Sequence, residues 1–140
     1  RGRIDRIDLD PHGQAVVYDY KGASAPGAGK WVGQGNFQVA LYMHAAEQLL
    51  GLNVLGGFYQ PLSGRDLKAR GALSSQAPEG LAAVRGDLLD HTDFQALIND
   101  AVCDARQAAR EIRSGALQPR PQSCQPRGGC RYPTICRCER

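Results

Sequence analysis

The chain has 140 residues, of which 17 are Lys or Arg and 14 are Asp or Glu, giving a formal net charge of +3. This length is enough for one domain with a single modest core. No apolar run is long enough to cross a membrane and no signal peptide is recognisable, so the sequence predicts a cytoplasmic protein without a membrane partner. The chain opens at Arg1 without an initiator Met, and we interpret it as a fragment of a longer protein.

Two strands joined by a turn are predicted at the start of the chain. Residues 2–9 alternate between apolar and polar side chains, and residues 15–21 are rich in β-branched and aromatic ones. Between them, Asp10-Pro11-His12-Gly13 is typical of a turn, because Pro presets its geometry and Gly relaxes it. The pattern therefore predicts a β-hairpin.

A glycine-rich segment over residues 22–35 follows the hairpin and predicts a mobile loop beside Lys21. The loop ends in Gly-Lys but lacks the residues of a phosphate-binding P-loop at two positions, Ser24 and Trp31. We expect Trp31 to cap the helix that follows, with stacking on a nucleic-acid base as the alternative.

A helix is predicted over residues 34–50, ending at Gly51, and residues 53–62 suit a third strand. Residues 63–79 are polar and irregular, and residues 81–89 are ambiguous. The buried stripe of the helix is expected to consist of Phe37, Leu41, Ala45 and Leu49.

The clearest helical pattern covers residues 93–114. Thr92 and Gln95 would form a capping box at its start, and Gly115 is a plausible stop. The buried face is expected to consist of Phe94, Leu97, Ala101, Ala105, Ala108 and Ile112.

Two aspartates of the predicted hairpin carry the first functional signal. Because alternate residues of a strand share a face, Asp5 and Asp19 each lie among apolar neighbours, where a lone charge is costly. A five-residue loop would pair Leu9 with Ala15 and bring the two aspartates opposite each other. A four-residue loop would place Tyr18 opposite Asp5 instead. We favour the first register because it pairs apolar residues with each other.

Lys21 lies two residues beyond Asp19 and shares its face. Two opposed carboxylates repel each other unless a divalent cation lies between them. A lysine beside them can position an attacking water or steady the charge that develops on a phosphorane. Carboxylates, a metal and a lysine are what phosphodiester hydrolysis needs. An amphipathic hairpin with surface ion pairs explains the same pattern, since Asp-x-Lys is short and common.

The C-terminal part is rich in cysteine and arginine. From Arg106 onward there are eight arginines and two acids, which predicts either an anionic partner such as phosphate or a solvated surface. Cys124, Cys130 and Cys136 are separated by five residues each. Nothing indicates secretion, so a metal or cluster site is favoured over disulfides. Zinc is the weaker metal because no Cys-x-x-Cys pair and no nearby His is present, and reduced thiols remain an alternative.

Four short segments stand in a fixed order along the chain: GRIDRID (2–8), VYDYK (17–21), QVALY (38–42) and CRYPTICR (130–137). Together they resemble the signature of RecB/AddB-type nucleases of the PD-(D/E)XK superfamily. The resemblance spans nearly the whole chain. It implies an α/β fold, with a truncated restriction-endonuclease-like core over residues 1–118. In that core a mixed sheet is flanked by helices, and a Cys-rich tail follows over residues 119–140.

The resemblance also implies roles for single residues. Asp5 and Asp19 would hold Mg²⁺ or Mn²⁺ together with the main-chain carbonyl of Tyr20, and Lys21 would orient the water. A Gln-x-x-x-Tyr motif supports the site and contacts DNA in the family, and residues four apart share one helical face. The five residues assigned to catalysis are thus Asp5, Asp19, Lys21, Gln38 and Tyr42.

Two further ligand sets follow from the resemblance. The family places a His or Glu metal ligand on a helix upstream of the first strand. Nothing precedes Arg1 here, so we expect this fragment to bind metal poorly and to cut DNA slowly or not at all. In iron–sulfur members, three C-terminal cysteines and one upstream cysteine hold a 4Fe-4S cluster. Cys124, Cys130 and Cys136 would be the C-terminal three, with a wider first spacing than is usual.

The predicted function is Mg²⁺-dependent DNA hydrolysis in a parent protein that works in double-strand-break repair with a helicase domain or subunit. A second hypothesis is a non-catalytic DNA-binding and iron–sulfur scaffold module. A third is a small interaction domain that is stabilised by zinc or a cluster and has no DNA role.

Overall fold

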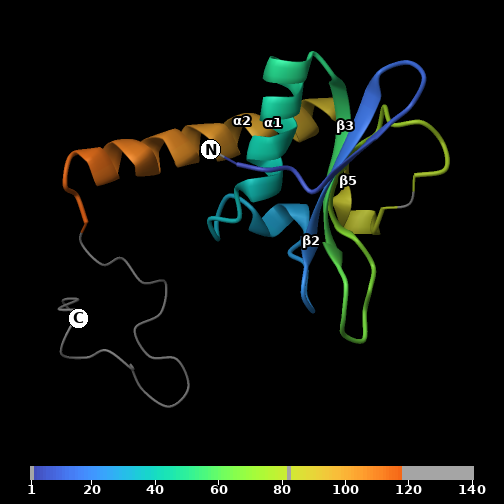
Figure 1. Cartoon of the computed structure of the whole chain (residues 1–140), viewed down its shortest axis with the longest axis horizontal. Coiled ribbons are helices and arrows are strands. Elements are labelled where there is room, and N and C mark those ends of the chain that lie inside the picture. The colour runs from blue at the N-terminus through green and yellow to red at the C-terminus, as the bar shows by residue number, and fades with distance from the viewer. Residues whose placement is uncertain (1, 82, 118–140) are drawn as a thin grey trace. The chain divides into compact units, whose positions relative to one another are not determined.

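The computed structural model describes residues 2–81 and 83–117 (Figure 1). The chain divides into two compact units, Arg1–Arg106 and Gln107–Arg140. The first unit holds a mixed five-stranded sheet of order β1-β2-β3-β4-β5, which confirms the predicted α/β class. The elements are β1 (Arg6–Leu9), β2 (Gln14–Lys21), α1 (Gln38–Leu50), β3 (Asn53–Pro61), β4 (Arg70–Ser74), β5 (Leu88–Leu89) and α2 (His91–Arg113).

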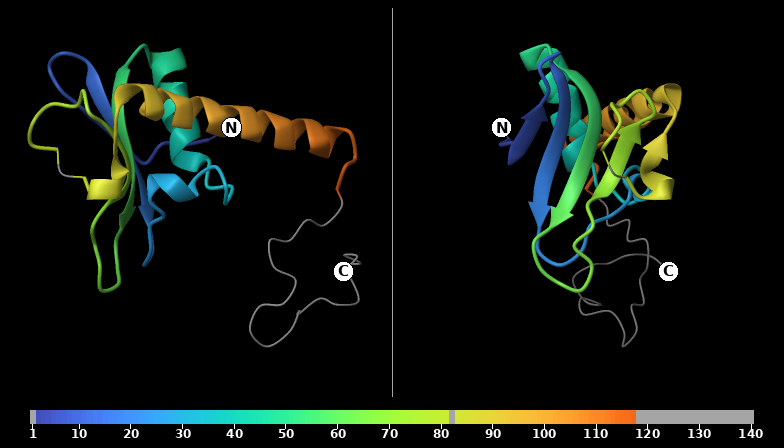
Figure 2. Two further views of the ribbon diagram at one scale, coloured as in Figure 1. Left: turned by 180° about the vertical axis from the view of Figure 1, so that it is seen from behind. Right: turned by 90° about the vertical axis from the view of Figure 1, so that its right-hand side faces the viewer.

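The sheet alternates between antiparallel and parallel pairs. β1 is antiparallel to β2, β2 is parallel to β3, β3 is antiparallel to β4, and β4 is parallel to β5. A parallel pair needs a crossover connection, and α1 provides it between β2 and β3. Both α1 and the first part of α2 lie on one face of the sheet (Figures 1 and 2). On the opposite face, the segment between β4 and β5 covers Val16, Phe58 and Leu73.

The hairpin has the register that the apolar pattern favoured. Leu9 pairs with Ala15, and the ladder runs to the pair of Arg6 and Tyr18. The carboxylate of Asp10 accepts hydrogen bonds from the backbone N–H groups of residues 12 and 14, at 2.8 Å each. Gly13 has a φ of +78°, a conformation that favours glycine. These contacts fix the five-residue loop and hence the face on which each hairpin side chain lies.

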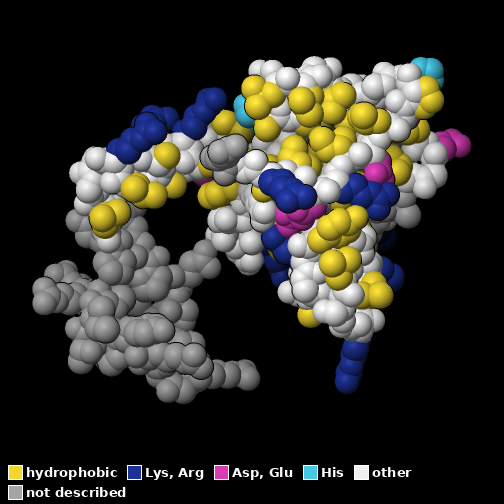
Figure 3. All heavy atoms as spheres, in the orientation of Figure 1, with side chains coloured by type: hydrophobic (Ala, Val, Ile, Leu, Met, Phe, Trp, Pro, Cys, Tyr) yellow, Lys and Arg dark blue, Asp and Glu magenta, His cyan; other side chains and the backbone are white. Residues whose placement is uncertain are grey.

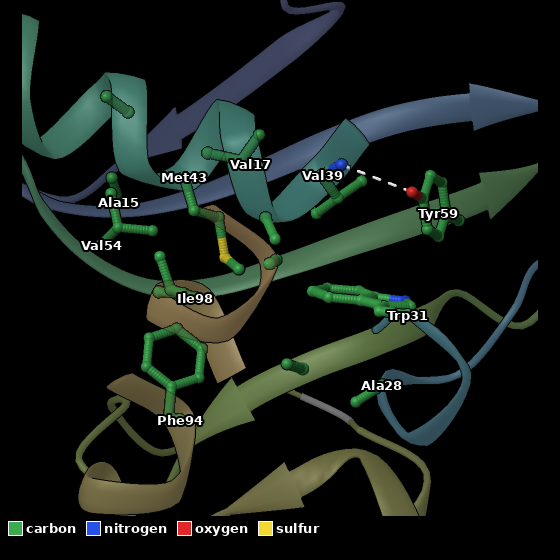
Figure 4. Close-up of a cluster of buried hydrophobic side chains, with 14 residues drawn as sticks. Ala15, Val17, Ala28, Trp31, Val39, Met43, Val54, Tyr59, Phe94 and Ile98 are labelled. Carbon is green, nitrogen blue, oxygen red and sulfur yellow. Dashed lines mark hydrogen bonds between the residues drawn. The ribbon is translucent and has the colours of Figure 1, made fainter. Parts of the chain in front are cut away.

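The main core fills the space between the sheet and the two helices (Figure 4). Among its fully buried side chains are Ala15, Val17, Val39, Met43, Val54, Phe94 and Ile98. α1 approaches the sheet closely at Gly57 of β3, where an added Cβ would lie 2.6 Å from Val39 Cγ1 and would also meet Met43. The absence of a side chain at Gly57 therefore sets how closely α1 packs on β3.

The predicted buried stripe of α1 is wrong. Val39, Ala40, Met43 and Ala46 face the core, whereas Leu49 is 80% exposed. The two stripes are offset by two residues, which is about 200° around a helix. Apolar residues occur on both sides of α1, so periodicity alone could not select the face. Its start at Gln38 is also four residues later than predicted.

The glycine-rich segment before α1 is not a simple loop. It contains a 3-10 turn, η1 (Ala28–Lys30), and it buries Trp31 completely. The Trp31 indole donates a hydrogen bond to Pro26 O at 3.2 Å and packs edge-on against Tyr59 (Figure 4). Trp31 therefore neither caps α1 nor offers its face to a nucleic-acid base, and both predictions for it are wrong. Burial of one large aromatic ring outweighs the loop-like composition around it.

The second half of the chain agrees with the sequence in part. β3 lies where the third strand was predicted, but β4 lies within the stretch that was read as irregular. β5 and a 3-10 turn, η2 (Arg85–Asp87), occupy the ambiguous stretch. Within the described residues, no helix is long and apolar enough to cross a membrane.

α2 begins near its predicted start but has a different cap. The Asp90 carboxylate accepts the Asp93 N–H at 2.9 Å, so the capping box of Thr92 and Gln95 is wrong. Phe94 and Ala101 are buried as predicted, together with Ile98 and Val102. In the second unit, Ile112 is exposed, contrary to prediction, and Gly115 ends the helix with a φ of +77°.

Candidate active site

The residues that the sequence singled out gather where β2 and β3 end beside the first turn of α1. Asp19, Tyr20 and Lys21 are the last residues of β2, and Gln38 is the first residue of α1. Parallel strands end at the same edge of a sheet, where side chains from several elements converge and ligands commonly bind. α1 begins at this edge and carries the chain to the opposite edge, where β3 begins.

Asp19 is a buried carboxylate, only 3% exposed, and pairs in register with Tyr59 of β3. The Lys21 Nζ atom lies 2.6 Å from Asp19 Oδ2. Apart from this ion pair, the oxygen accepts no hydrogen bond from the described residues. The ion pair therefore balances the charge of the buried carboxylate, and no other donor of the described chain competes for this oxygen.

Lys21 is held by side chains from three elements. Its Nζ donates a hydrogen bond of 2.8 Å to Gln38 Oε1, and Gln38 Nε2 donates one of 3.2 Å to Tyr42 OH. The same ammonium lies 4.9 Å from the centre of the Tyr59 ring. With Asp19 beside it, the ammonium is fixed in position while it remains partly accessible to solvent.

Asp5 lies just before β1 and is exposed. Its Oδ2 accepts the backbone N–H of Tyr20 at 3.0 Å, which places this carboxylate beside the strand that carries Asp19. Continuing the hairpin ladder by one residue brings Asp5 opposite Asp19. In the described part of the chain, no three His, Cys, Asp or Glu side chains are grouped so that they could hold a metal ion.

Tyr59 is a site residue that sequence analysis missed. Its hydroxyl donates to Asn36 O at 3.1 Å and accepts the Val39 N–H at 3.4 Å, which ties β3 to the start of α1. Burial raises the pKa of Tyr59 above its usual range, so the hydroxyl stays protonated. No sequence motif marked Tyr59, because its role depends on the parallel pairing of β2 with β3.

The structure describes one of the five cysteines of the chain. Cys124, Cys130 and Cys136 lie outside the described residues. Cys103, on α2, is an exposed free thiol.

A cavity of about 380 Å³ opens at the other end of β2, next to the hairpin turn. Leu9, Val16, Leu55 and Leu81 form much of its lining. Of its three carboxylates, Asp8 is paired with Arg6, Asp10 is used by the turn, and Glu79 is exposed to solvent. This cavity therefore carries none of the chemistry found around Asp19.

A family model described as the PD-(D/E)XK nuclease superfamily matches residues 1–137. The matched range includes all five residues that sequence analysis assigned to catalysis. The mixed sheet with its two helices agrees with the restriction-endonuclease-like core that the resemblance implied. No curated protein and no solved structure matches the chain significantly.

Proposed function

Since the chain belongs to the PD-(D/E)XK nuclease superfamily, we propose that it is the nuclease domain of a metal-dependent enzyme that hydrolyses DNA phosphodiesters. The observation that carries this proposal is the buried Asp19 carboxylate with the fixed ammonium of Lys21 beside it. Replacing a buried ion pair by apolar residues is often neutral for stability, so the stability of the fold alone does not account for this pair.

The available donors fit a hard divalent cation. Mg²⁺ and Mn²⁺ prefer oxygen ligands, and Mg²⁺ usually keeps several waters beside one or two carboxylates. Asp19 offers a buried oxygen without a hydrogen bond, and Asp5 offers a second carboxylate beside the same strand. These two residues, with the Tyr20 carbonyl, would hold the ion. When bound, the metal would polarise the scissile phosphate and supply an activated water.

The side chains around the metal have separate tasks in this proposal. Lys21 would donate hydrogen bonds to the attacking water or to the phosphate oxygen on which negative charge develops. Gln38 Oε1 accepts a hydrogen bond from one N–H of the Lys21 ammonium and so directs its remaining two N–H donors. Tyr42 in turn holds the Gln38 amide, and from the first two turns of α1 both residues would also guide the DNA strand.

We also infer a RecB/AddB-like parent protein that acts in DNA repair with a helicase domain or subunit. The order of the four sequence segments supports this inference. Residues 1–118 would form the nuclease core and residues 119–140 a tail in which Cys124, Cys130 and Cys136 bind a 4Fe-4S cluster. Iron analysis of the purified full-length parent tests the cluster: iron is expected in the wild type and lost in Cys130→Ser, and an iron-free wild-type parent would refute it.

The catalytic assignment is tested by Asp19→Asn and Lys21→Ala in the proposed full-length parent. Each substitution is expected to lower the rate of Mg²⁺-dependent DNA cleavage by about 100-fold or more, because one transition-state contact or metal ligand is lost. DNA affinity, measured without divalent metal, should be retained. Asp8→Asn is the matched control, since Asp8 is a partly exposed carboxylate of β1 that pairs with Arg6.

Wild-type cleavage rates in both Asp19→Asn and Lys21→Ala would show that the site is wrongly assigned. A wild-type protein that binds DNA but never cleaves it would instead support the non-catalytic scaffold hypothesis.

A further inference from the structure

The connection between β3 and β4 projects beyond the sheet at the edge where the candidate site lies (Figure 1). We call residues 62–68, all of them exposed, the β3–β4 tip. Leu62 N–H donates to the carbonyls of Lys21 and Gly22, at 2.9 and 3.1 Å. The Ser63 N–H and hydroxyl both donate to Gly22 O, at 2.9 and 3.0 Å. The tip is therefore attached to Lys21 and to the residue that follows it.

Several contacts give the β3–β4 tip a defined shape. At its base, Gln60 Nε2 donates to Pro61 O at 3.0 Å and to Leu67 O at 2.9 Å, which joins the two sides of the hairpin. At its end, Asp66 Oδ1 accepts the Lys68 N–H at 3.0 Å in an Asx turn. Gly64, with a φ of +102°, allows the backbone to pass close to Ala23. The tip can thus present its side chains in a fixed arrangement.

The β3–β4 tip presents both apolar and cationic side chains to solvent. Leu62 is 66% exposed and Leu67 is 53% exposed. Arg65 and Lys68 are exposed, and neither forms an ion pair within the described residues. The space-filling view shows hydrophobic and basic side chains together on this projection, at the bottom of the molecule (Figure 3). Exposed leucines beside unpaired cations favour a partner that is both anionic and apolar.

We infer that the β3–β4 tip binds the DNA substrate strand beside the cleavage site, an inference that rests on the proposed nuclease function. Arg65 and Lys68 contact backbone phosphates, which set position without reading sequence. Leu62 and Leu67 pack against bases, as apolar wedges do where base stacking is interrupted. Unstacked bases occur in single strands and at frayed duplex ends, so the tip favours these forms over an intact duplex.

The experiment uses two double variants of the full 140-residue chain, Arg65→Ala/Lys68→Ala and Leu62→Ser/Leu67→Ser. Matched controls are Arg85→Ala, which removes an exposed cation elsewhere, and Leu49→Ser, which removes a leucine that is 80% exposed. All these positions are at the surface, so the variants should fold normally. The affinity for fluorescent single-stranded and blunt double-stranded DNA is measured over a range of salt concentrations without divalent metal.

The charge variant is expected to bind both DNA forms about 10-fold more weakly and to lower the slope of log affinity against log salt by about 2. The leucine variant is expected to lose affinity for single strands and to bind blunt duplex as the wild type does. Wild-type DNA binding by both variants would overturn the tip inference alone and leave the proposed function standing. A wild-type chain without any DNA affinity would overturn the proposed function and the tip inference together.

Discussion

The side chain of Tyr59, on β3, connects the start of α1 with Lys21 at the end of β2. Its hydroxyl bridges Asn36 O and the Val39 N–H, while its ring contacts Trp31 and the Lys21 ammonium. The ring accounts for packing and for the cation–π contact, which contributes about 0.5–2 kcal/mol in proteins. The hydroxyl accounts for the attachment of α1, so the two contributions can be separated by mutation.

Tyr59→Phe removes the hydroxyl and keeps the ring. We expect the free energy of unfolding to fall by about 1–3 kcal/mol, because two buried backbone groups lose their partner. Urea denaturation followed by circular dichroism measures the change. Tyr18→Phe is the control, since Tyr18 is only half-buried and its ring stacks on Phe58. Equal stabilities of the two variants would show that the hydroxyl of Tyr59 does not hold α1 in place.

At the scale of elements, the contact between α1 and β3 depends on Gly57. A side chain there would meet Met43 and would lie 2.6 Å from Val39 Cγ1, so these two side chains or the helix that carries them would have to shift. Because Gln38 and Tyr42 are on the same helix, such a movement would also displace the partners of Lys21.

Gly57→Ala is therefore expected to lower the free energy of unfolding by about 1–3 kcal/mol, as overpacking of a core does. Gly29→Ala is the matched control, because no atom lies within 4 Å of an added Cβ at Gly29. Thermal denaturation of the two variants measures the difference. A Gly57→Ala protein as stable as the Gly29→Ala protein would mean that Gly57 does not limit how closely α1 packs on β3.

At the scale of the whole molecule, the sequence was sufficient to predict those strands and turns that depend on neighbouring residues alone. The register of the hairpin followed from pairing Leu9 with Ala15, and the third strand from its run of apolar residues. The fold class followed from a resemblance that the family match supports. Local pattern could not select the buried face of α1, since Leu49 and Val39 are equally apolar and only the sheet distinguishes them.

The residues of the candidate site could likewise be predicted only in part. Asp19, Lys21 and Gln38 could be singled out from sequence, and the structure brings them together. Tyr59 could not, because it acts through a strand pairing that spans forty positions between Asp19 and its partner. Trp31 was misread for a similar reason: a loop-like composition does not reveal that distant side chains enclose the ring.

The parallel pairing of β2 with β3 has a consequence for biosynthesis. The proposed Mg²⁺ ligands Asp5, Asp19 and Tyr20 lie within the first 21 positions, yet the ring that contacts Lys21 is at position 59. Contacts of such long sequence separation form late in folding, because a long loop must close first. When only the β1–β2 hairpin has left the ribosome, the nascent chain would therefore have its acidic residues but no Tyr59 ring to hold the Lys21 side chain in position. Catalytic competence would be acquired only after the third strand has left the ribosome and docked.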